Sequence, residues 1–401
     1  MKIWLICGVL GPNTALYLQK RHTSLEAAAG AFQNKLIDGL RINGASFRVI
    51  SVPFIGSYPT TSQVIRFKPL KEDSSGYTYI GFQNISILRN YFRRRNLKRY
   101  LKTVEIDDSE ENLFLIYSAH TPFVSVASEW KKKHPSIKIC LIVPDLPMYM
   151  NLNRHSCLYS TAKRIDTWIL YRKLDAVDSY VLLTEQMTEK LPIGGKPYLL
   201  TEGILDNIDE PTEDLESDIR TIVYTGAIRA RYNICELVDA FQAIKGDKFR
   251  LIMCGSGDAV DYVQQACVQD SRISWLGQLD RTAVLDLQKK ATVLVNPRLD
   301  SGDFTRFSFP SKLLEYLSAG KPTVSAVLPG MPLVYKDFVY EIDGTLPPVT
   351  AIQKAIEAAL NDSLTGRLTK QKRFADYAKD TLLKQIVVRN ILKLNGLSAS
   401  N

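Results

Sequence analysis

The sequence lacks the features of several protein classes. Its six cysteines include no Cys-x-x-Cys pair, and it has only four histidines and no Asp-x-Asp motif. We therefore expect no disulfide framework, no bound metal and no cofactor. No stretch approaches the ~20 uninterrupted apolar residues that a membrane-spanning helix needs. The scattered cysteines are expected to be reduced core residues of a cytoplasmic protein.

The composition is that of a globular protein too long for one core. The chain has 401 residues, of which 45% are hydrophobic and 23% charged. At roughly 150 residues per domain, two large domains are expected. The acidic, proline-interrupted stretch DNIDEPTEDLESDIR indicates a linker at 206–220. The predicted domains are 1–205 and 221–380, with a final helix over 381–401 that crosses back to the first domain.

Apolar runs alternate with helical patterns in both halves. This alternation predicts an α/β fold of two Rossmann-like, doubly wound domains that face a central cleft, where the strand ends bind ligands. The opening stretch MKIWLICGVLGP is interpreted as a strand rather than a signal peptide, because no clear cleavage site follows. The expected strands are KIWLICG, FRVISVP, YTYIGF, NLFLIYSAH, IKICLIVPD, SYVLLT and PYLLTEG, then TIVYTG, FRLIMCG, RISWLG, ATVLVNP, KPTVSAV and FVYEIDG.

The first helix is predicted to begin at Thr23. Thr23 and Glu26 have the spacing of a capping box, in which the two side chains satisfy backbone N–H groups at the helix start. Leu25, Phe32 and Leu36 then recur at helical spacing.

One segment carries most of the net charge of +9. LRNYFRRRNLKRYLK (88–102) has seven basic residues and no acid, which leaves 9 − 7 = +2 for the rest of the chain. Such a run can contact an anionic membrane surface, or it can be the solvated face of a helix. Nucleic acid is not expected as a partner, because no nucleic-acid-binding module accompanies the run. The residues expected to contact the membrane are Arg93, Arg94, Arg95, Lys98 and Arg99.

The stretch FTRFSFPSKLLEYLSAGKP (304–322) has the pattern of a phosphate-binding helix. Pro310 is well suited to the first turn of a helix, and Gly320 can adopt the left-handed conformation that ends one. Lys312 lies beside the free N–H groups of the first turn, and Arg298 follows the strand VLVNP, so two cations can reach one phosphate group. Glu315, one turn further, can accept hydrogen bonds from ribose hydroxyls. A capped surface helix with a Lys-Glu pair explains the same spacing.

Several motifs of the second half together resemble those of a known enzyme family. They are VYTGAI (223–228), CGSGD (254–258), WLGQL (275–279), VNPR (295–298) and SFPSKLLEYLSAGKP (308–322), with looser matches at AHTP (119–122), PDLPMYM (144–150) and LLTEQM (182–187). The chain resembles the retaining GT-B glycosyltransferases of family 4, in particular their bacterial polysaccharide-assembly branch. The resemblance implies a metal-independent hexosyltransferase that uses a nucleotide-sugar donor, with a UDP-sugar favoured.

The resemblance also implies roles for individual residues. His120 would lie near the transferred sugar and Asp145 would face the acceptor, so both are candidate catalytic residues. His120 could instead cap the following helix, and Asp145 could be a turn residue. The residues implied to bind the donor are Gly226, Arg229, Gly255, Leu276, Gly277, Arg298, Asp303, Ser311, Lys312 and Glu315.

The chain departs from the family pattern at three places. Ala227 and Tyr232 stand where many relatives have an arginine and a lysine, so Arg229 or Arg231 is the expected replacement. Phe307 stands where relatives have the first of two glutamates, and Asp303 could stand in for it. The identity of the donor stays open.

Other functions fit parts of the sequence. Gly255-Ser-Gly257 after a strand could belong to a dehydrogenase, but the third glycine of the dinucleotide fingerprint is missing. A sugar-nucleotide epimerase on the same scaffold and a non-catalytic nucleotide-binding subunit of a polysaccharide-assembly complex are the remaining alternatives. The favoured function is sugar transfer to a lipid-linked or growing glycan in capsular polysaccharide or exopolysaccharide biosynthesis, by an enzyme at the inner face of the plasma membrane.

Overall fold

The computed structural model divides into two compact units. It describes residues 1–72, 76–86, 88–149, 157–211, 218–300 and 302–397; at 71, 72, 157–160, 162 and 303 only the backbone is described. One unit comprises Met1–Ile204 with Lys384–Asn401, and the other comprises Leu205–Leu383. Six residues of the predicted linker, 212–217, lie outside the described residues.

The first unit is built on an eight-stranded sheet. Its strand order is β10-β9-β8-β7-β1-β2-β5-β4, and every pairing is parallel except that of β4 with β5. The central strands β1, β7 and β8 are mostly apolar and almost entirely buried, as is typical of parallel strands covered on both faces. The strands are β1 (Lys2–Cys7), β2 (Phe47–Ser51), β4 (Leu70–Glu72), β5 (Tyr77–Tyr79), β7 (Asn112–Tyr117), β8 (Ile137–Val143), β9 (Ser179–Leu182) and β10 (Tyr198–Leu200), with β3 (Arg66–Phe67) and β6 (Phe82–Gln83) forming a separate antiparallel pair.

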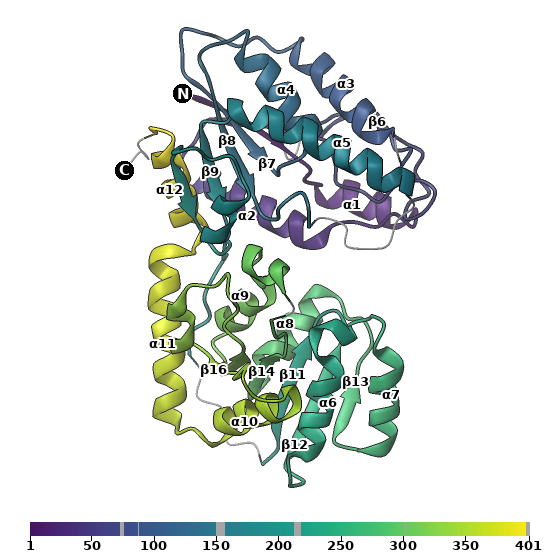
Figure 1. Ribbon diagram of the computed structural model, residues 1–401, viewed down its shortest axis with the longest axis vertical. Coiled ribbons are helices and arrows are strands. Elements are labelled where there is room, and N and C mark those ends of the chain that lie inside the picture. The colour runs from purple at the N-terminus through teal and green to yellow at the C-terminus, as the bar shows by residue number, and fades with distance from the viewer. Residues whose placement is uncertain (73–75, 87, 150–156, 212–217, 301, 398–401) are drawn as a thin grey trace. The chain divides into compact units, whose positions relative to one another are not determined.

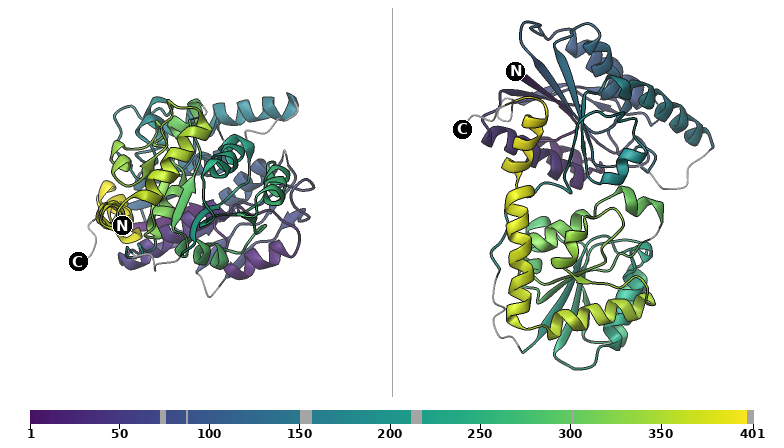
Figure 2. Two further views of the ribbon diagram at one scale, coloured as in Figure 1. Left: turned by 90° about the horizontal axis from the view of Figure 1, so that it is seen from below. Right: turned by 60° about the vertical axis from the view of Figure 1, so that its left-hand side comes forward.

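Helices cover both faces of this sheet. The helices α3, α4 and α5 pack side by side on one face (Figure 1), whereas α12 and α2 pack against each other on the opposite face (Figure 2). The final helix of the chain therefore belongs to the first unit. The helices are α1 (Pro12–Gln19), α2 (Ala27–Ile42), α3 (Arg89–Leu101), α4 (Thr121–Lys131), α5 (Cys157–Lys173) and α12 (Lys384–Leu394).

The predicted capping box at Thr23 is wrong. The helix α2 begins only at Ala27, and no side-chain hydrogen bond caps it. The Thr23 hydroxyl lies 3.0 Å from the Ser62 hydroxyl, and Leu25 forms an isolated β-bridge with Ile55. The Thr23 side chain and the Leu25 backbone therefore interact with residues far along the chain instead of forming the first turn of the helix.

The basic run forms α3, and one of its arginines is not on the surface. Arg93 is 2% exposed, donates a hydrogen bond to the Pro53 carbonyl oxygen at 2.8 Å and lies 4.5 Å from the Phe82 ring. It shares the buried face of the helix with Leu97 and Leu101. The expectation that Arg93 contacts a membrane is therefore wrong, because its charge points into the unit.

The second unit contains a six-stranded sheet with the order β13-β12-β11-β14-β15-β16, all parallel. This is the 3-2-1-4-5-6 order of a Rossmann fold. Its strands are β11 (Arg220–Thr225), β12 (Phe249–Cys254), β13 (Ile273–Trp275), β14 (Val293–Asn296), β15 (Thr323–Ser325) and β16 (Tyr340–Glu341). Its helices are α6 (Ile234–Ala243), α7 (Val260–Gln269), α8 (Arg281–Lys289), α9 (Ser311–Ser318), α10 (Pro348–Asn361) and α11 (Leu364–Thr381).

The predicted fold class is confirmed, since both units are Rossmann-like and every expected strand segment contains a strand. Among the described helices, none is both long and apolar enough to cross a membrane. The described cysteines are all free thiols, and Cys7, Cys140 and Cys254 are buried.

Candidate functional site

The strand order of the second unit creates one natural ligand position. The first and fourth strands, β11 and β14, are neighbours, and the chain winds away from them in opposite directions. In such sheets ligands bind beyond the carboxyl ends of the strands at this switch point. Gly226 directly follows β11, and Arg298 follows β14 by two residues. The sequence-predicted donor residues therefore gather at the edge where a ligand is expected.

Glycines at these strand ends allow the backbone to pack closely. A Cβ atom on Gly255 would lie 1.7 Å from the Gly226 carbonyl oxygen, and Gly255 has a φ of +132°. The Gly255 N–H donates to the Gly277 carbonyl oxygen at 2.7 Å. No other residue type fits at Gly255 without moving the ends of β11 and β12 apart.

The helix α9 begins beside this edge, as the sequence predicts. It runs from Ser311 to Ser318 with Pro310 as its N-cap residue, and Gly320 has the left-handed φ of +63°. Its three leucines are buried, so the helix presents only its other face to solvent. Ser311 is exposed at the first helical position.

A polar cluster covers the solvent side of α9; we call it the Glu315 cluster. Lys312 Nζ donates to Glu315 Oε1 at 2.8 Å and lies 3.5 Å from Thr225 Oγ1. Gln288 Nε2 donates to the same Glu315 oxygen at 2.7 Å, and Arg281 donates to Glu315 Oε2 at 3.3 Å. The sequence did not reveal Thr225, Arg281 or Gln288, because β11 and α8 lie far from α9 along the chain.

The Glu315 carboxylate is held in its charged form. Burial by itself would raise the pKa of Glu315, but Lys312, Gln288 and Arg281 together lower it below its ordinary value. A carboxylate has about four acceptor positions, and these three donors leave room for another. Glu315 can therefore still accept a hydrogen bond from a ligand hydroxyl.

The end of β11 is anchored to the base of the cluster. The Tyr316 hydroxyl accepts from the Thr225 N–H at 2.8 Å and lies 2.9 Å from the Thr225 carbonyl oxygen. Gln288 Nε2 also donates to Thr225 Oγ1 at 2.8 Å. The cluster is thus fixed to the sheet rather than to α9 alone.

Arg298 is positioned by aromatic rings. Its guanidinium lies 5.4 Å from the Tyr232 ring and 5.1 Å from the Phe304 ring. Arg231 stacks on the same Tyr232 ring at 4.9 Å and donates to its hydroxyl at 3.1 Å. Two guanidiniums therefore flank Tyr232, while Arg229 contacts neither ring in the described structure.

The remaining predicted donor-binding residues differ in which of their groups a ligand could contact. Leu276 is exposed, and its backbone N–H is bonded to the Met253 carbonyl oxygen at 2.9 Å. Phe307, at the position of the family's first glutamate, is 2% exposed and belongs to the core. Only the backbone of Asp303 is described, so its predicted role lies outside the described side chains.

The first unit has a separate pocket at its own switch point, between β1 and β7. A cavity of about 440 Å³ lies there, and it brings together both candidate catalytic residues. Charged groups from α3 and α5, which the sequence did not assign to a site, also reach it. Among the lining residues are Glu26, Phe54, Arg89, Arg93, His120, Asp145, Lys163 and Asp166.

His120 is half-buried in this pocket and carries a neutral imidazole. Burial, then Arg93 and Arg89, lower its pKa well below the ordinary value. Its ring packs edge-on against Phe54 and Phe123, with centroids 5.6 and 4.8 Å away. The backbone of His120 caps α4 but its side chain does not, and its buried Nδ1 has no hydrogen-bond partner among the described residues.

Acidic groups complete the pocket. Asp145 follows β8 and is exposed, so it is accessible to a ligand. Asp166 Oδ2 accepts from the Thr121 hydroxyl at 2.9 Å, and burial raises the pKa of Asp166. Across the part of the chain that the structure describes, no group of three or more His, Cys, Asp or Glu side chains is arranged to hold a metal.

Comparison with known proteins adds information about the second unit. Residues 207–381 match the family model of glycosyl transferases group 1, a segment just under half of the chain. None of the curated protein sequences that were compared matches the chain.

Solved structures match the chain over its whole length. A sucrose-phosphate synthase from Thermosynechococcus elongatus has a TM-score of 0.62 at 15% identity, covering 99% of this chain and 98% of its own. HepE of Anabaena, in complex with UDP, has a TM-score of 0.62 at 13% identity and covers 99% and 100%. The lipopolysaccharide outer core galactosyltransferase WaaB has a TM-score of 0.60 at 15% identity and covers 99% of both chains. These likenesses establish the fold, which is that of GT-B glycosyltransferases.

Proposed function

We propose that the chain is a retaining glycosyltransferase that moves a hexose from a UDP-sugar to a lipid-linked or growing cell-surface glycan. The observation that carries the proposal is that the Glu315 cluster and Arg298 both lie at the switch point of the second unit, at the carboxyl ends of β11 and β14. The family model, which covers the same residues, supports it. The UDP in the HepE structure favours UDP as the nucleotide.

In this proposal cations of the second unit hold the diphosphate. Lys312 exchanges its contact with Glu315 for a phosphate oxygen, and Arg298 binds the same group from the end of β14. Arg231 supplies the further cation, because it shares the Tyr232 ring with Arg298, whereas Arg229 does not. Fixed cations of this kind stabilise the charge that develops on the leaving diphosphate.

Glu315 binds the donor ribose. Gln288 and Arg281 keep its carboxylate oriented after Lys312 turns to the phosphate. The backbone around Leu276 and Gly277 faces the base. These roles follow the order of the groups along the ligand: phosphate at the start of α9, ribose one turn further.

The pocket of the first unit receives the sugars. A neutral His120 can donate or accept one hydrogen bond to a sugar hydroxyl, and Asp145 can accept one from the acceptor. We propose front-side attack without a bound metal, in which the leaving phosphate takes the acceptor proton. A covalent glycosyl adduct on a side chain would contradict this course.

The proposal places the enzyme at the inner face of the plasma membrane, in polysaccharide biosynthesis. The similarity to WaaB, a lipopolysaccharide galactosyltransferase, supports a cell-surface glycan. The surface of α3 supports contact with anionic lipid through Arg95 and Arg99, whereas Arg93 is buried and Arg94 and Lys98 are paired with Glu129.

Acceptor-dependent turnover tests the function. Purified protein is incubated with UDP-glucose, UDP-galactose or UDP-N-acetylglucosamine, with and without a total bacterial glycolipid extract, and released UDP and altered sugars are measured. We expect UDP release that requires the extract and is lost in Lys312→Ala. Sugar conversion without the extract would indicate an epimerase, and nucleotide binding without any turnover would indicate a scaffold subunit.

A further inference from the structure

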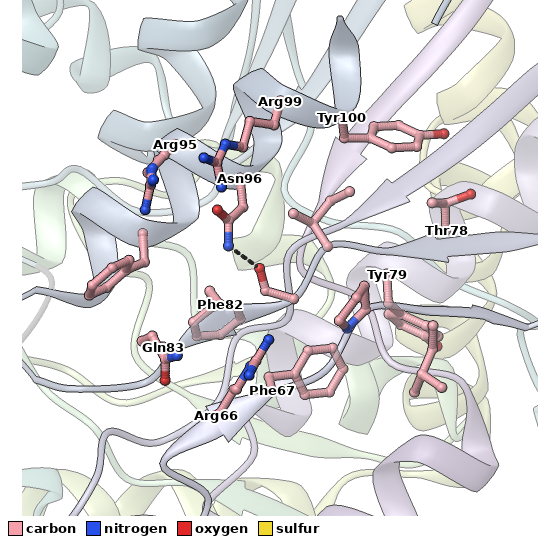
Figure 3. A pocket seen from close by; sticks show the side chains of 15 residues that line it. Arg66, Phe67, Thr78, Tyr79, Phe82, Gln83, Arg95, Asn96, Arg99 and Tyr100 are labelled. Atoms are coloured by element: carbon pink, nitrogen blue, oxygen red, sulfur yellow. Dashed lines mark hydrogen bonds between the residues drawn. The ribbon is translucent and has the colours of Figure 1, made fainter. Parts of the chain in front are cut away.

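A second cavity of the first unit lies at the edge of its sheet that carries β5 and β4. Its volume is about 590 Å³, within the range of small-molecule sites. It is enclosed by one face of α3, by β3, and by the segment 78–83 that joins β5 to β6. We call it the α3 pocket (Figure 3).

Three arginines surround this pocket. Arg95 and Arg99 extend from successive turns of α3, and Arg66 reaches in from β3 on the other side (Figure 3). None of the three forms an ion pair with a described side chain, and no acidic residue is among the described residues that line the cavity. Three like charges around one cavity repel one another, and an anion placed between them would relieve that repulsion.

Two other basic residues of α3 share one acidic partner. Arg94 and Lys98, on a different face of the helix, both bind Glu129 of α4, at 2.5 and 2.7 Å. The basic residues of α3 therefore have different surroundings. Arg93 is buried, Arg89 lines the His120 pocket, Arg94 and Lys98 share the single charge of Glu129, and Arg95 and Arg99 line the α3 pocket. Arg95 and Arg99 form no ion pair with a described side chain, so both are available to a ligand of the α3 pocket.

The floor of the pocket is apolar. Phe67 and Phe82 form its closed base beneath the arginines, since they are only 3% and 2% exposed (Figure 3). The ring surface that a ligand can reach comes from α3, where Phe92 and Tyr100 are half-buried. Asn96 fixes the wall by donating to the Gly81 carbonyl oxygen at 2.7 Å. Aromatic surface of this kind binds hydrocarbon rather than a bare ion.

We propose that the α3 pocket binds an amphiphilic phosphate, whose anionic head lies among the three arginines and whose hydrocarbon part lies on the aromatic lining. Arginine suits this role because its planar guanidinium binds phosphate oxygens in pairs. The site is distinct from the pocket that holds His120. The two pockets share no lining residue, and Arg93, which lines the His120 pocket, contacts the ring of Phe82, which lines the α3 pocket. The proposal does not depend on glycosyl transfer.

Titration calorimetry with three matched probes tests the proposal: geranyl phosphate, geraniol and inorganic phosphate. We expect geranyl phosphate to bind at least tenfold more tightly than either fragment alone. Arg99→Gln should weaken geranyl phosphate by about tenfold or more, as loss of one charged hydrogen bond does. Arg94→Gln is the matched control, because it removes the same charge from the other face of the helix.

Vesicle sedimentation identifies the source of the phosphate. If the ligand is a membrane lipid, phosphatidylcholine vesicles that contain phosphatidic acid should retain the wild type and Arg94→Gln but not Arg99→Gln. If the ligand is soluble, geranyl phosphate binds and the vesicles retain none of the three proteins. UDP binding by the second unit should be the same in all three, which separates this test from that of the proposed function.

Two results would overturn the proposal. One is geranyl phosphate binding no more tightly than inorganic phosphate, which would leave the aromatic lining without a role. The other is equal weakening by Arg94→Gln and Arg99→Gln, which would show a diffuse charge effect instead of a site.

Discussion

Replacing Glu315 by glutamine separates the two halves of the proposed donor site. In the structure Glu315 accepts hydrogen bonds from Lys312, Gln288 and Arg281. Glutamine keeps the shape but loses the charge and one acceptor oxygen. The variant should therefore lose the ribose contact while Lys312 remains free to bind phosphate.

The expected size follows from the groups involved. A hydrogen bond to a charged group contributes about 1.5–3 kcal/mol, so the Kd for UDP should rise roughly 10- to 150-fold. Pyrophosphate has no ribose, so its Kd should be unchanged or lower. The free energy of unfolding should fall by only about 1–2 kcal/mol, because the side chains of Lys312 and Arg281 are 38% and 61% exposed and solvent screens their charges.

Calorimetric titration of UDP and pyrophosphate into the wild type and Glu315→Gln measures this directly. Equal weakening of both ligands would refute the assignment, since Glu315 would then act only by holding Lys312. Equal affinity of the two proteins for UDP would exclude Glu315 from the site.

The stability effect should also depend on pH. The pKa of Glu315 is lower in the folded protein than its ordinary value of 4.5, so the carboxylate stabilises the folded state above that value. This contribution is lost as the pH falls from 4.5 through the lowered pKa. Urea unfolding should therefore show a constant difference between the wild type and Glu315→Gln above about pH 5.5, and a shrinking difference below pH 4.5.

Three further substitutions test other parts of the structure. Gly255→Ala places a Cβ atom 1.7 Å from a backbone oxygen and should lower the free energy of unfolding by about 3 kcal/mol or more, measured by urea titration. Arg93→Met removes a buried hydrogen bond and should cost about 1–3 kcal/mol, whereas Arg95→Met should stay within about 0.5 kcal/mol. His120→Phe should make stability less sensitive to acid. Because the pKa of His120 is lowered in the folded state, the wild type should lose stability relative to the variant as the pH falls below 6.5.

Each of these three substitutions has a control or an outcome that would contradict the prediction. Gly344→Ala, where a Cβ atom meets open space, should be nearly neutral; an equal loss at Gly344 and Gly255 would remove the packing argument. Equal costs at Arg93 and Arg95 would contradict the division of α3 into faces. A constant difference between the wild type and His120→Phe from pH 5 to 8 would mean that His120 has an ordinary pKa in the folded protein.

The features that the sequence predicted well are helices and strands whose pattern lies within a short segment of the chain. The helix that carries Lys312 and Glu315 follows from a proline, three leucines and a glycine within a dozen residues, and the structure contains it. The strands were equally clear, because parallel strands covered on both faces are continuous apolar runs.

What the sequence could not predict depends on tertiary packing. Arg281 and Gln288 reach Glu315 only because α8 packs beside β11, and nothing in their own neighbourhood marks them. A run of arginines does not reveal which one a helix buries, so Arg93 was misassigned. Thr23 has the spacing of a cap, but its hydroxyl lies against Ser62 instead.

The central claim is that Lys312 belongs to a binding site for a nucleoside diphosphate. The most direct test is calorimetric titration of UDP, GDP and ADP into the wild type, Lys312→Ala and the control Lys336→Ala, whose lysine forms a surface pair with Glu341 in the same unit. The account predicts that one nucleotide, with UDP favoured, binds the wild type and Lys336→Ala equally, and Lys312→Ala more weakly by about 1.5–3 kcal/mol. Failure of all three nucleotides to bind, or unchanged affinity in Lys312→Ala, would contradict it.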